Sequence, residues 1–462
     1  MSPSIHSLLF TNQPLSDDDI PEAKKLLAAE MDAVQCLEEQ IKELEANLDA
    51  LKAQHDQRVA NVRTYQSLLS PVRRIPAEIL SDIFIASLSE MDGPVPERKM
   101  VPNYTSIALT QVCRLWRRTA LSTPSLWSNI YLSPPEYPRF RQTWCIPPPE
   151  EVDRWQQAME RLKARTKIYI DRSAKNPLTI TICARDPFCN PLNDQDSASW
   201  ERFGRAVRET QKYMSPIVNV LYRASAKWSH VNLELGIGTP DSPLLRFLTI
   251  PSGTLPLLSS LRLDIVLGNT GRNRPARDQW KQPIQDRIKS CLGAFLWAPS
   301  LTSLTLDTWW TLPPSTTPGS WKNLLHLSVG AFKSLDPLDL LERCPNLETF
   351  KLVSLSEIGI DLLRSNARVH LIPLHRLRVI KAEGLLDLPI GFSRWLSLPS
   401  LTSLEVRGNK FHGRAGFLAM LSAIGSQLEV VVFNYCMMTQ ANLDACLRLL
   451  PNVKHLTLLS SA

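Results

Sequence analysis

The sequence has none of the short motifs that organise common catalytic or cofactor sites. It lacks a Gly-x-x-x-x-Gly-Lys-Ser/Thr phosphate loop, a Gly-x-Gly-x-x-Gly turn and a Gly-x-Ser-x-Gly nucleophile turn. His370 and His375 do not have the His-Glu-x-x-His spacing of a zinc protease. No dense Lys and Arg stripe with interleaved aromatic residues is present. We therefore predict a protein that is not an enzyme, holds no cofactor and does not bind nucleic acid.

Long apolar runs and paired cysteines are missing as well. The sequence has no apolar run of about 18 residues, which predicts no transmembrane helix. Its first ten residues lack the basic and apolar segments of a secretory signal. The nine cysteines form no Cys-x-x-Cys pair, so we expect free thiols in a reducing compartment. Together with the missing transmembrane helix and secretory signal, this predicts a protein of the cytoplasm or nucleus that does not contact a membrane. Cys183 and Cys189 are separated by Pro187 and have no second pair, so we predict no metal site.

Size and charge indicate a globular chain with more than one domain. With 462 residues, of which 44% are hydrophobic and 21% charged, two or three domains are expected. The net charge is +7, but residues 1–70 carry 12 Asp and Glu against 6 Lys and Arg. An acidic N-terminal segment thus precedes a basic body, which hints at an acidic target.

Residues 16–69 predict one long helix after a disordered segment at 1–15. Ser16 and the following aspartates can cap the helix, and no Pro or Gly follows Pro21 before Ser70. A heptad pattern places Leu27, Val34, Ile41, Leu48, His55, Val62 and Leu69 at a, and Glu30, Leu37, Leu44, Leu51, Arg58 and Tyr65 at d. Two interpretations remain open: a coiled coil that forms a homodimer, or a single helix that lies on the body of the protein.

Two short amphipathic helices are predicted after Pro71. The first has apolar residues at helical spacing, namely Ile79, Leu80, Ile83 and Phe84. The second runs over 108–120 and has apolar residues at Val112, Leu115, Trp116 and Ala120. Because such short helices are unstable alone, we expect them to pack on each other and on a partner. We predict Cys113 to be a buried packing residue rather than a reactive thiolate.

This segment resembles the F-box-like domain found in many large fungal protein families. The resemblance rests on Ile-Pro-x-Glu-Ile-Leu-x-x-Ile-Phe from Ile75, Val-Cys-x-x-Trp from Val112 and Leu-Trp at Leu126. It implies a small helical domain at 70–132 that docks on a Skp-type adaptor of a cullin ubiquitin ligase. The adaptor-binding residues that it implies are Ile75, Pro76, Ile79, Leu80, Ile83, Phe84, Val112 and Trp116.

Residues 89–104 depart from the compact form of that domain. They contain a Gly and three prolines and predict an inserted surface loop. The alternative to an F-box is that both helices are ordinary core helices of an all-α cap.

A short leucine motif repeats in the C-terminal part, after a predicted Pro-rich linker and connecting helix at 133–175. The motif is an apolar residue, two spacers, an apolar residue, one spacer and an apolar residue, most often with Leu at the first position. Its copies begin at residues 258, 301, 324, 347, 377, 401, 428 and 453. Weaker copies begin at Trp127, Leu178 and Trp228. Each copy predicts one short strand, and stacked copies can bury the apolar faces that a single copy would expose.

The repeats resemble the degenerate leucine-rich repeats that follow F-boxes in the same fungal families. The resemblance implies an irregular leucine-rich-repeat α/β solenoid at 176–462. The alternative is an irregular α/β domain without solenoid curvature. The predicted fold class is therefore multidomain α/β: a long N-terminal helix, a small α-helical F-box-like unit and the solenoid.

Together the two resemblances imply a substrate-recognition subunit of a cullin-type ubiquitin ligase. It would bind a Skp-type adaptor through the F-box-like helices and an unknown protein target through the repeats. Trp309 and Trp310, just past a predicted strand, are either recognition residues or core residues. The alternative function is a coiled-coil and leucine-rich-repeat scaffold without any ligase association.

Overall fold

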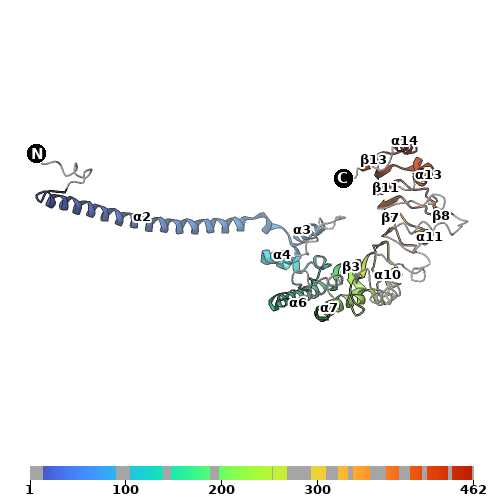
Figure 1. Ribbon diagram of the computed structural model, residues 1–462, viewed down its shortest axis with the longest axis horizontal. Coiled ribbons are helices and arrows are strands. Elements are labelled where there is room, and N and C mark those ends of the chain that lie inside the picture. Colours follow the sequence, from blue (N-terminus) through green and yellow to red (C-terminus); the bar gives the residue numbers. More distant parts are fainter. Residues whose placement is uncertain are drawn as a thin grey trace. The chain divides into compact units, whose positions relative to one another are not determined.

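A computed structural model gives the fold of the chain (Figure 1). It describes residues 14–89, 105–138, 147–187, 197–251, 253–267, 293–307, 321–330, 337–353, 371–383, 396–407, 414–434 and 440–459. The chain divides into two units, Met1–Leu80 and Ser81–Ala462, and the division falls inside one helix.

The first unit consists mainly of the 50-residue helix α2 (Ile20–Leu69), which Figure 1 shows as one uninterrupted helix. The predicted long helix is thus confirmed. Pro21 stands in its first turn, and Ser70 ends it before the short helix η1 (Pro71–Arg74). No residue of α2 is buried, and its apolar a and d side chains from Leu27 to Leu51 are 51–67% exposed. Most of the segment predicted to be disordered, residues 1–13, lies outside the described residues.

After η1, the described residues of the F-box-like segment form short helices and a second 3-10 turn. They are α3 (Ala77–Ser89), α4 (Thr105–Val112), α5 (Arg114–Leu121) and η2 (Pro124–Trp127). The prediction of one helix through 108–120 was wrong, because Cys113 adopts an extended backbone between α4 and α5. Its sulfur accepts a hydrogen bond from the Trp116 backbone N–H at 3.5 Å and so caps α5. Cys113 is exposed, so its prediction as a buried packing residue was also wrong. The predicted loop lies outside the described residues from 90 to 104.

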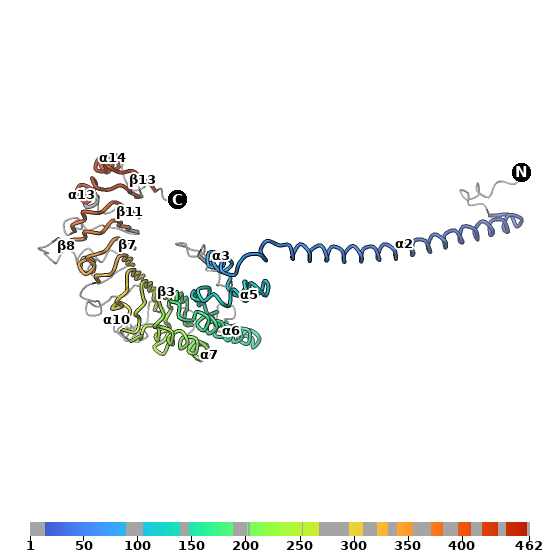
Figure 2. The backbone as a smooth tube through the Cα atoms, turned by 180° about the vertical axis from the view of Figure 1, so that it is seen from behind, coloured from blue at the N-terminus to red at the C-terminus, as the bar shows by residue number. Residues whose placement is uncertain are grey.

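The second unit is built on a parallel sheet of 11 strands, which follow one another along the sheet in sequence order (Figure 2). A strand lies at each predicted leucine motif. The strands are β1 (Asn129–Leu132), β2 (Leu178–Arg185), β3 (Trp228–Ile237), β4 (Ser260–Leu267), β5 (Ser303–Leu306), β6 (His326–Val329), β7 (Thr349–Val353), β9 (Val379–Glu383), β11 (Ser403–Arg407), β12 (Val430–Asn434) and β13 (His455–Leu459). A small separate sheet pairs β8 (Ile372–Pro373) with β10 (Leu396–Ser397).

Helices connect many of these strands, as parallel pairing requires. The two longest, α6 and α7, pack against each other next to the first strands. The helices are α6 (Pro149–Arg172), α7 (Ser197–Arg223), α8 (Leu245–Leu248), α10 (Gly293–Leu296), α11 (Pro337–Glu342), α13 (Arg414–Ile424) and α14 (Gln440–Arg448). Among the described helices, none is both long and apolar enough to cross a membrane.

The leucine motif forms the core of the sheet. Its first leucine is 0–3% exposed in the seven copies Leu258, Leu301, Leu324, Leu347, Leu377, Leu401 and Leu428. Along β4, β5 and β7, buried and more exposed residues then alternate, so that one face of these strands packs on the core.

One backbone pattern repeats from strand to strand. The Ser259 carbonyl oxygen accepts from the N–H groups of both Thr302 and Ser303, at 2.8 and 3.0 Å. The same forked pair recurs at each later step of the sheet up to Lys454 and His455, which donate to Glu429 at 2.8 and 3.0 Å. We name this repeated arrangement the carbonyl clamp. It fixes where each strand begins relative to the previous strand.

Asparagine side chains add a second repeated contact. The side-chain amide of Asn323 donates to the Pro299 carbonyl at 2.8 Å, and that of Asn346 donates to the Lys322 carbonyl at 2.8 Å. Both asparagines stand directly before the first leucine of a motif. They therefore tie the turn of one repeat to the turn of the repeat before it.

The F-box-like helices after Leu80 are continuous with the sheet. The first strand, β1, follows η2 directly and pairs with β2 from Asn129 to Leu132. The indole of Trp127 lies edge-on to the Tyr169 ring of α6, with ring centroids 5.1 Å apart. The indole N–H donates to the Ala120 carbonyl at 2.8 Å. The predicted linker does not separate two independent bodies here, although its residues 139–146 lie outside the described chain.

Candidate functional site

Helix α3 has apolar residues on two of its faces. On one face Leu80 and Phe84 are each 1% exposed, and Leu88 is also buried. On another face Ile79 and Ile83, one helical turn apart, are 52% and 48% exposed. These two large aliphatic side chains on the outside of so short a helix are candidates for a docking surface.

The buried face holds α3 on α5. The rings of Phe84 and Trp116 meet edge to face, with centroids 4.9 Å apart. The hydroxyl groups of Ser81 and Thr123 are hydrogen-bonded at 2.9 Å. The packing fixes the orientation of α3 and therefore the direction in which Ile83 points.

The junction of α4 and α5 presents another apolar side chain. Val112, the last residue of α4, is 59% exposed. The break at Cys113 turns the chain there, and the guanidinium Nε of Arg117 donates to the Thr110 carbonyl at 2.7 Å. Val112 thus sits at a corner that a backbone cap and a side-chain hydrogen bond both hold.

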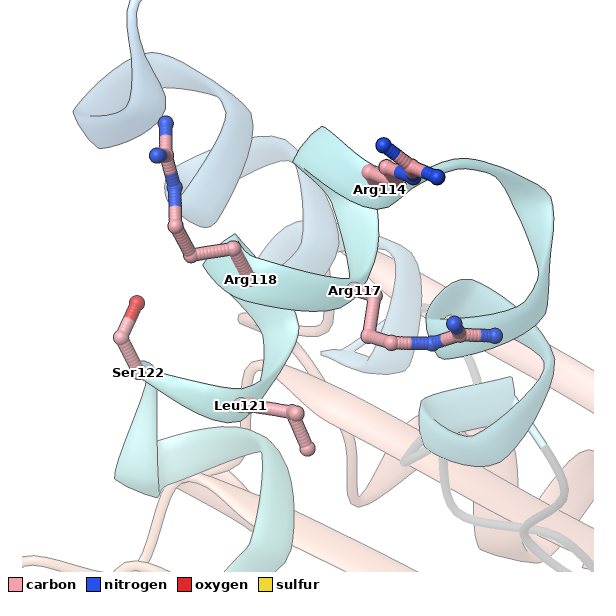
Figure 3. A pocket seen from close by; sticks show the side chains of 5 residues that line it. All are labelled: Arg114, Arg117, Arg118, Leu121 and Ser122. Carbon is pink, nitrogen blue, oxygen red and sulfur yellow. The ribbon is translucent and has the colours of Figure 1, made fainter.

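Three arginines of α5 line a surface pocket together with Leu121 and Ser122 (Figure 3). They are Arg114, Arg117 and Arg118, and all three are exposed. Figure 3 shows the side chains of Arg114 and Arg118 extending from α5 in different directions. Neither has an ion-pair partner within the part of the chain that the structure describes. The positive charge of α5 is therefore open to an acidic partner.

The eight predicted adaptor-binding residues fall into three groups. Those with exposed side chains are Pro76, Ile79, Ile83 and Val112. Those that are partly exposed are Ile75 and Trp116, and those that are buried are Leu80 and Phe84. Our sequence analysis missed the arginines of α5, although their spacing places Arg114 and Arg118 one helical turn apart.

The face of the sheet away from the core carries a row of acidic side chains. Register places Cys183, Glu234 and Asp264 side by side on β2, β3 and β4, and Asp307 follows at the end of β5. Burial, and then the neighbouring carboxylates of Asp307 and Glu234, raise the pKa of Asp264. Arg262 pairs with Asp307 at 2.9 Å. We name Glu234, Asp264 and Asp307 the acidic row.

Cys183 lies beside Glu234 at the end of the acidic row and is not a reactive thiol. Its sulfur donates to a Glu234 carboxylate oxygen at 3.3 Å. Burial and this carboxylate raise the pKa of Cys183 to about 12, so the thiol stays protonated at neutral pH.

Farther along the sheet the charges are paired. Lys381 contacts Glu405 at 2.9 Å, and Arg407 also pairs with Glu405. Burial alone would raise the pKa of Glu405, but Lys381 and Arg407 together lower it. The exposed face of β3 to β5 is thus locally acidic, whereas the net charge of the C-terminal part had hinted at an acidic target.

Several candidates from the sequence receive no structural account. Cys189, Trp309, Trp310 and His370 lie outside the described residues. Among the residues that are described, no group of three or more His, Cys, Asp or Glu side chains could hold a metal ion.

Comparison with known families supports the F-box resemblance. The family model described as F-box-like matches residues 72–133. A search of curated proteins found no relative of the chain. F-box domains generally bind Skp1-type adaptors in cullin ligase complexes, and proteins of this family are generally non-enzymatic adaptors. The match therefore suggests an adaptor-binding role in substrate recognition.

Proposed function

We propose that this chain is the substrate-recognition subunit of a cullin-type ubiquitin ligase. The F-box-like helices bind a Skp-type adaptor, and the sheet unit binds a target protein. The observation that carries the proposal is the F-box-like match at 72–133 over a helix that leaves Ile79 and Ile83 exposed. The chain acts by holding the target near the ubiquitin-charged enzyme, with no chemistry of its own.

The predicted residues have two roles in this proposal. Ile79, Ile83 and Val112, which are exposed, contact the adaptor, together with Pro76. Leu80, Phe84 and Trp116 position them by packing inside the helical unit, and Ile75 leads into α3. Arg114 and Arg118 extend the contact toward an acidic part of the adaptor.

We propose that residues 176–462 form leucine-rich repeats of the kind that accompany fungal F-boxes. The carbonyl clamp, the asparagine contacts and the buried first leucine recur at the same place in successive repeats, which supports this assignment. The outward face of the strands, with its acidic row, is then the surface that meets the target. Basic side chains of the target would lie on Glu234, Asp264 and Asp307.

The connection between the two binding parts supports a receptor role. The pairing of β1 with β2 and the contact of Trp127 with Tyr169 join the helices after Leu80 to the start of the sheet. A target on the sheet would therefore be held in a fixed position relative to α5. A fixed position raises the effective concentration of target lysines at the ligase more than a flexible tether does.

We also propose that α2 pairs with α2 of a second copy. Each chain offers six apolar seam residues, Val34, Leu37, Ile41, Leu44, Leu48 and Leu51. Burying one such side chain fully contributes about 2 kcal/mol, so twelve half-exposed side chains contribute about 12 kcal/mol. That gain is comparable with an association cost of about 4–15 kcal/mol. The pair should therefore dissociate on dilution.

We expect the protein to work in the cytoplasm or nucleus, where ubiquitin ligases of this type act. Cys36 and Cys113 are free and exposed, which suits a reducing compartment.

Co-purification with the adaptor tests the main proposal. A double variant, Ile79→Asp and Ile83→Asp, puts two charges on the exposed face of α3 and leaves Leu80 and Phe84 in place. We expect at least about a tenfold loss of bound adaptor with an unchanged circular dichroism spectrum. The matched control is Ile168→Asp with Leu257→Asp, which adds the same charge at two similarly exposed residues elsewhere. Full adaptor binding by the α3 variant would overturn the proposal.

The scaffold function makes the opposite prediction for the unaltered chain. Affinity purification followed by mass spectrometry would then recover partners of the sheet unit but no adaptor or cullin subunit. The exposed seam of α2 is the observation that favours this second candidate, because a dimeric stalk serves a scaffold equally well.

A further inference from the structure

We infer that two copies of this chain pair along α2 in parallel and in register, so that both F-box-like units and both sheets follow from the same end of the stalk. The inference rests on the pairing of α2 proposed above and is independent of the adaptor assignment. It makes the protein a bivalent receptor.

In a parallel coiled coil, the residue types of the seam favour two strands. Between residues 34 and 51, the a positions are Val34, Ile41 and Leu48, and every d position is Leu. β-Branched residues at a combined with Leu at d favour parallel two-stranded coiled coils over trimers and tetramers.

Nothing within the described chain covers this seam. No residue of α2 is buried, and the seam side chains are among the most exposed large apolar residues of the protein. The surrounding positions carry polar residues such as Glu39, Lys42 and Glu43, so the helix has one apolar stripe rather than two. A single stripe fits a single partner helix.

Edge charges separate the two possible orientations. In a parallel pair, Glu38 lies beside Ala33 of the second copy, and Glu45 lies beside Gln40 of the second copy. In an antiparallel pair that matches the same apolar layers, Glu38 lies beside Glu45 of the second copy, and this contact occurs twice. Like charges at these positions disfavour the antiparallel pair.

The ends of the seam set the register. Glu30 precedes the apolar segment at a d position, and His55 and Arg58 follow it at a and d. If one helix shifted by one heptad, His55 would lie against Leu48 of the second copy. Fewer apolar residues would then face apolar residues of the second helix. The in-register pair keeps all six layers together. It sets Glu30 against Glu30 and Arg58 against Arg58 of the second copy, but these like charges lie outside the apolar segment.

The orientation determines what the dimer can bind. In a parallel pair the two Ser70 residues lie at one end of the stalk, and each leads into its own F-box-like unit and sheet. The partner on α2 is thus a second copy, and the favoured target is one that presents two binding sites. Binding of the second site becomes intramolecular and gains strength without any new contact.

The first experiment measures the mass of the full-length chain by light scattering during size-exclusion chromatography. We expect twice the mass of one chain, and the mass of one chain for Leu44→Lys, which puts a charge in the central layer. The matched control is Ala46→Lys, two residues away but off the seam, and we expect it to remain dimeric. An unaltered chain that stays monomeric as its loading concentration is raised would overturn the pairing, whatever the outcome of the adaptor test.

The second experiment distinguishes parallel from antiparallel pairing. In a background with Cys36→Ser and Cys113→Ser, the substitution Glu30→Cys should produce a disulfide-linked dimer on mild oxidation, because identical d positions adjoin in a parallel pair. In the antiparallel pair the two sulfurs would lie about 37 Å apart, from 25 residues at 1.5 Å each. A chain that is dimeric but gives no more cross-linked product than the background would overturn the parallel arrangement.

Discussion

Three carboxylates on neighbouring strands distinguish the outward face of the sheet. Like charges side by side on adjacent strands destabilise a sheet. Arg262 offsets the charge of Asp307, and Cys183 donates a hydrogen bond to Glu234. The raised pKa of Asp264 shows that its charge is disfavoured in the folded chain. Local destabilisation of this kind is typical of binding surfaces.

At the residue scale, Asp264→Asn should stabilise the protein at neutral pH. Because the folded pKa of Asp264 lies above its ordinary value of 3.8, the folded state binds more protons there than the unfolded state does. The destabilisation by this residue therefore grows as the pH rises from 3.8 through the raised pKa of the folded carboxyl group, and it shrinks again on acidification. Urea unfolding of the variant and the unaltered chain at pH 7 and pH 4.5 measures the difference. A difference that grew at the lower pH would contradict this account.

Our sequence analysis missed the acidic row, although its members share one place in the motif. Glu234, Asp264 and Asp307 each stand directly after the third apolar residue of a copy. Stacking of the copies therefore predicts that the three carboxylates lie side by side, and the register does set Glu234 opposite Asp264. The motif does not indicate how far each carboxylate is buried, and burial is the first cause of the raised pKa of Asp264.

At the element scale, the break between α4 and α5 changes the F-box-like unit most. No Pro or Gly occurs from Ala108 to Leu121, so apolar periodicity alone predicts a continuous helix. Cys113 instead turns the chain and uses its sulfur as a cap. The cap, rather than a helix breaker, thus places Val112 at an exposed corner.

Substitution of Cys113 tests this role. Cys113→Ala removes the acceptor for the Trp116 N–H and should lower the free energy of unfolding by about 0.5–1 kcal/mol. Cys113→Ser supplies a better cap and should not lower it. Thermal denaturation of the two variants gives the comparison. Equal melting temperatures for both would show that the sulfur does not stabilise α5.

The strands are the elements that the sequence predicts best. Seven of the eight copies have a buried first leucine, so the same packing requirement appears repeatedly in the sequence. The faces of α3 were less accessible to prediction. Ile79, Leu80, Ile83 and Phe84 are all apolar, and periodicity alone does not say which pair packs inside and which faces a partner.

At the scale of the whole molecule, each strand of the sheet pairs only with its neighbours in sequence order. Stability in such an arrangement is a sum of local terms and contacts between neighbours. A substitution that destabilises β12 should therefore leave the stability of β2 and β3 unchanged.

Gly425→Ala provides the test. A Cβ at residue 425, just before β12, would overlap the carbonyl oxygen of Leu449, and backbone cannot move aside cheaply. We expect a local loss of about 1–3 kcal/mol, seen by hydrogen exchange as faster exchange in β12 and β13 with β2 to β4 unchanged. The matched control is Gly204→Ala in α7, where the new Cβ would lie 3.4 Å from the Arg208 side chain. Uniformly faster exchange in the Gly425 variant would contradict neighbour-only coupling.

The sequence predicts the order of the parts at this scale better than their connection. The long helix, the helical unit and the repeated strands are each visible as patterns. The join between the helices and the sheet is visible only in part. The weak motif copy at Trp127 predicts β1, whereas the contact of Trp127 with Tyr169 lies across a proline-containing segment and has no such pattern. Contacts between residues far apart in sequence have no periodic signal.

The carbonyl clamp has a consequence for how such a protein can change over time. Successive motifs begin at 301, 324, 347, 377, 401, 428 and 453, so neighbouring repeats differ in length. The clamp nevertheless joins the same backbone atoms at each step. Residues can thus be inserted or lost between strands while the side chains on the outward face keep their spacing. During evolution, the length between strands could therefore change, and with it the bound target, while the pairing of the strands stays the same.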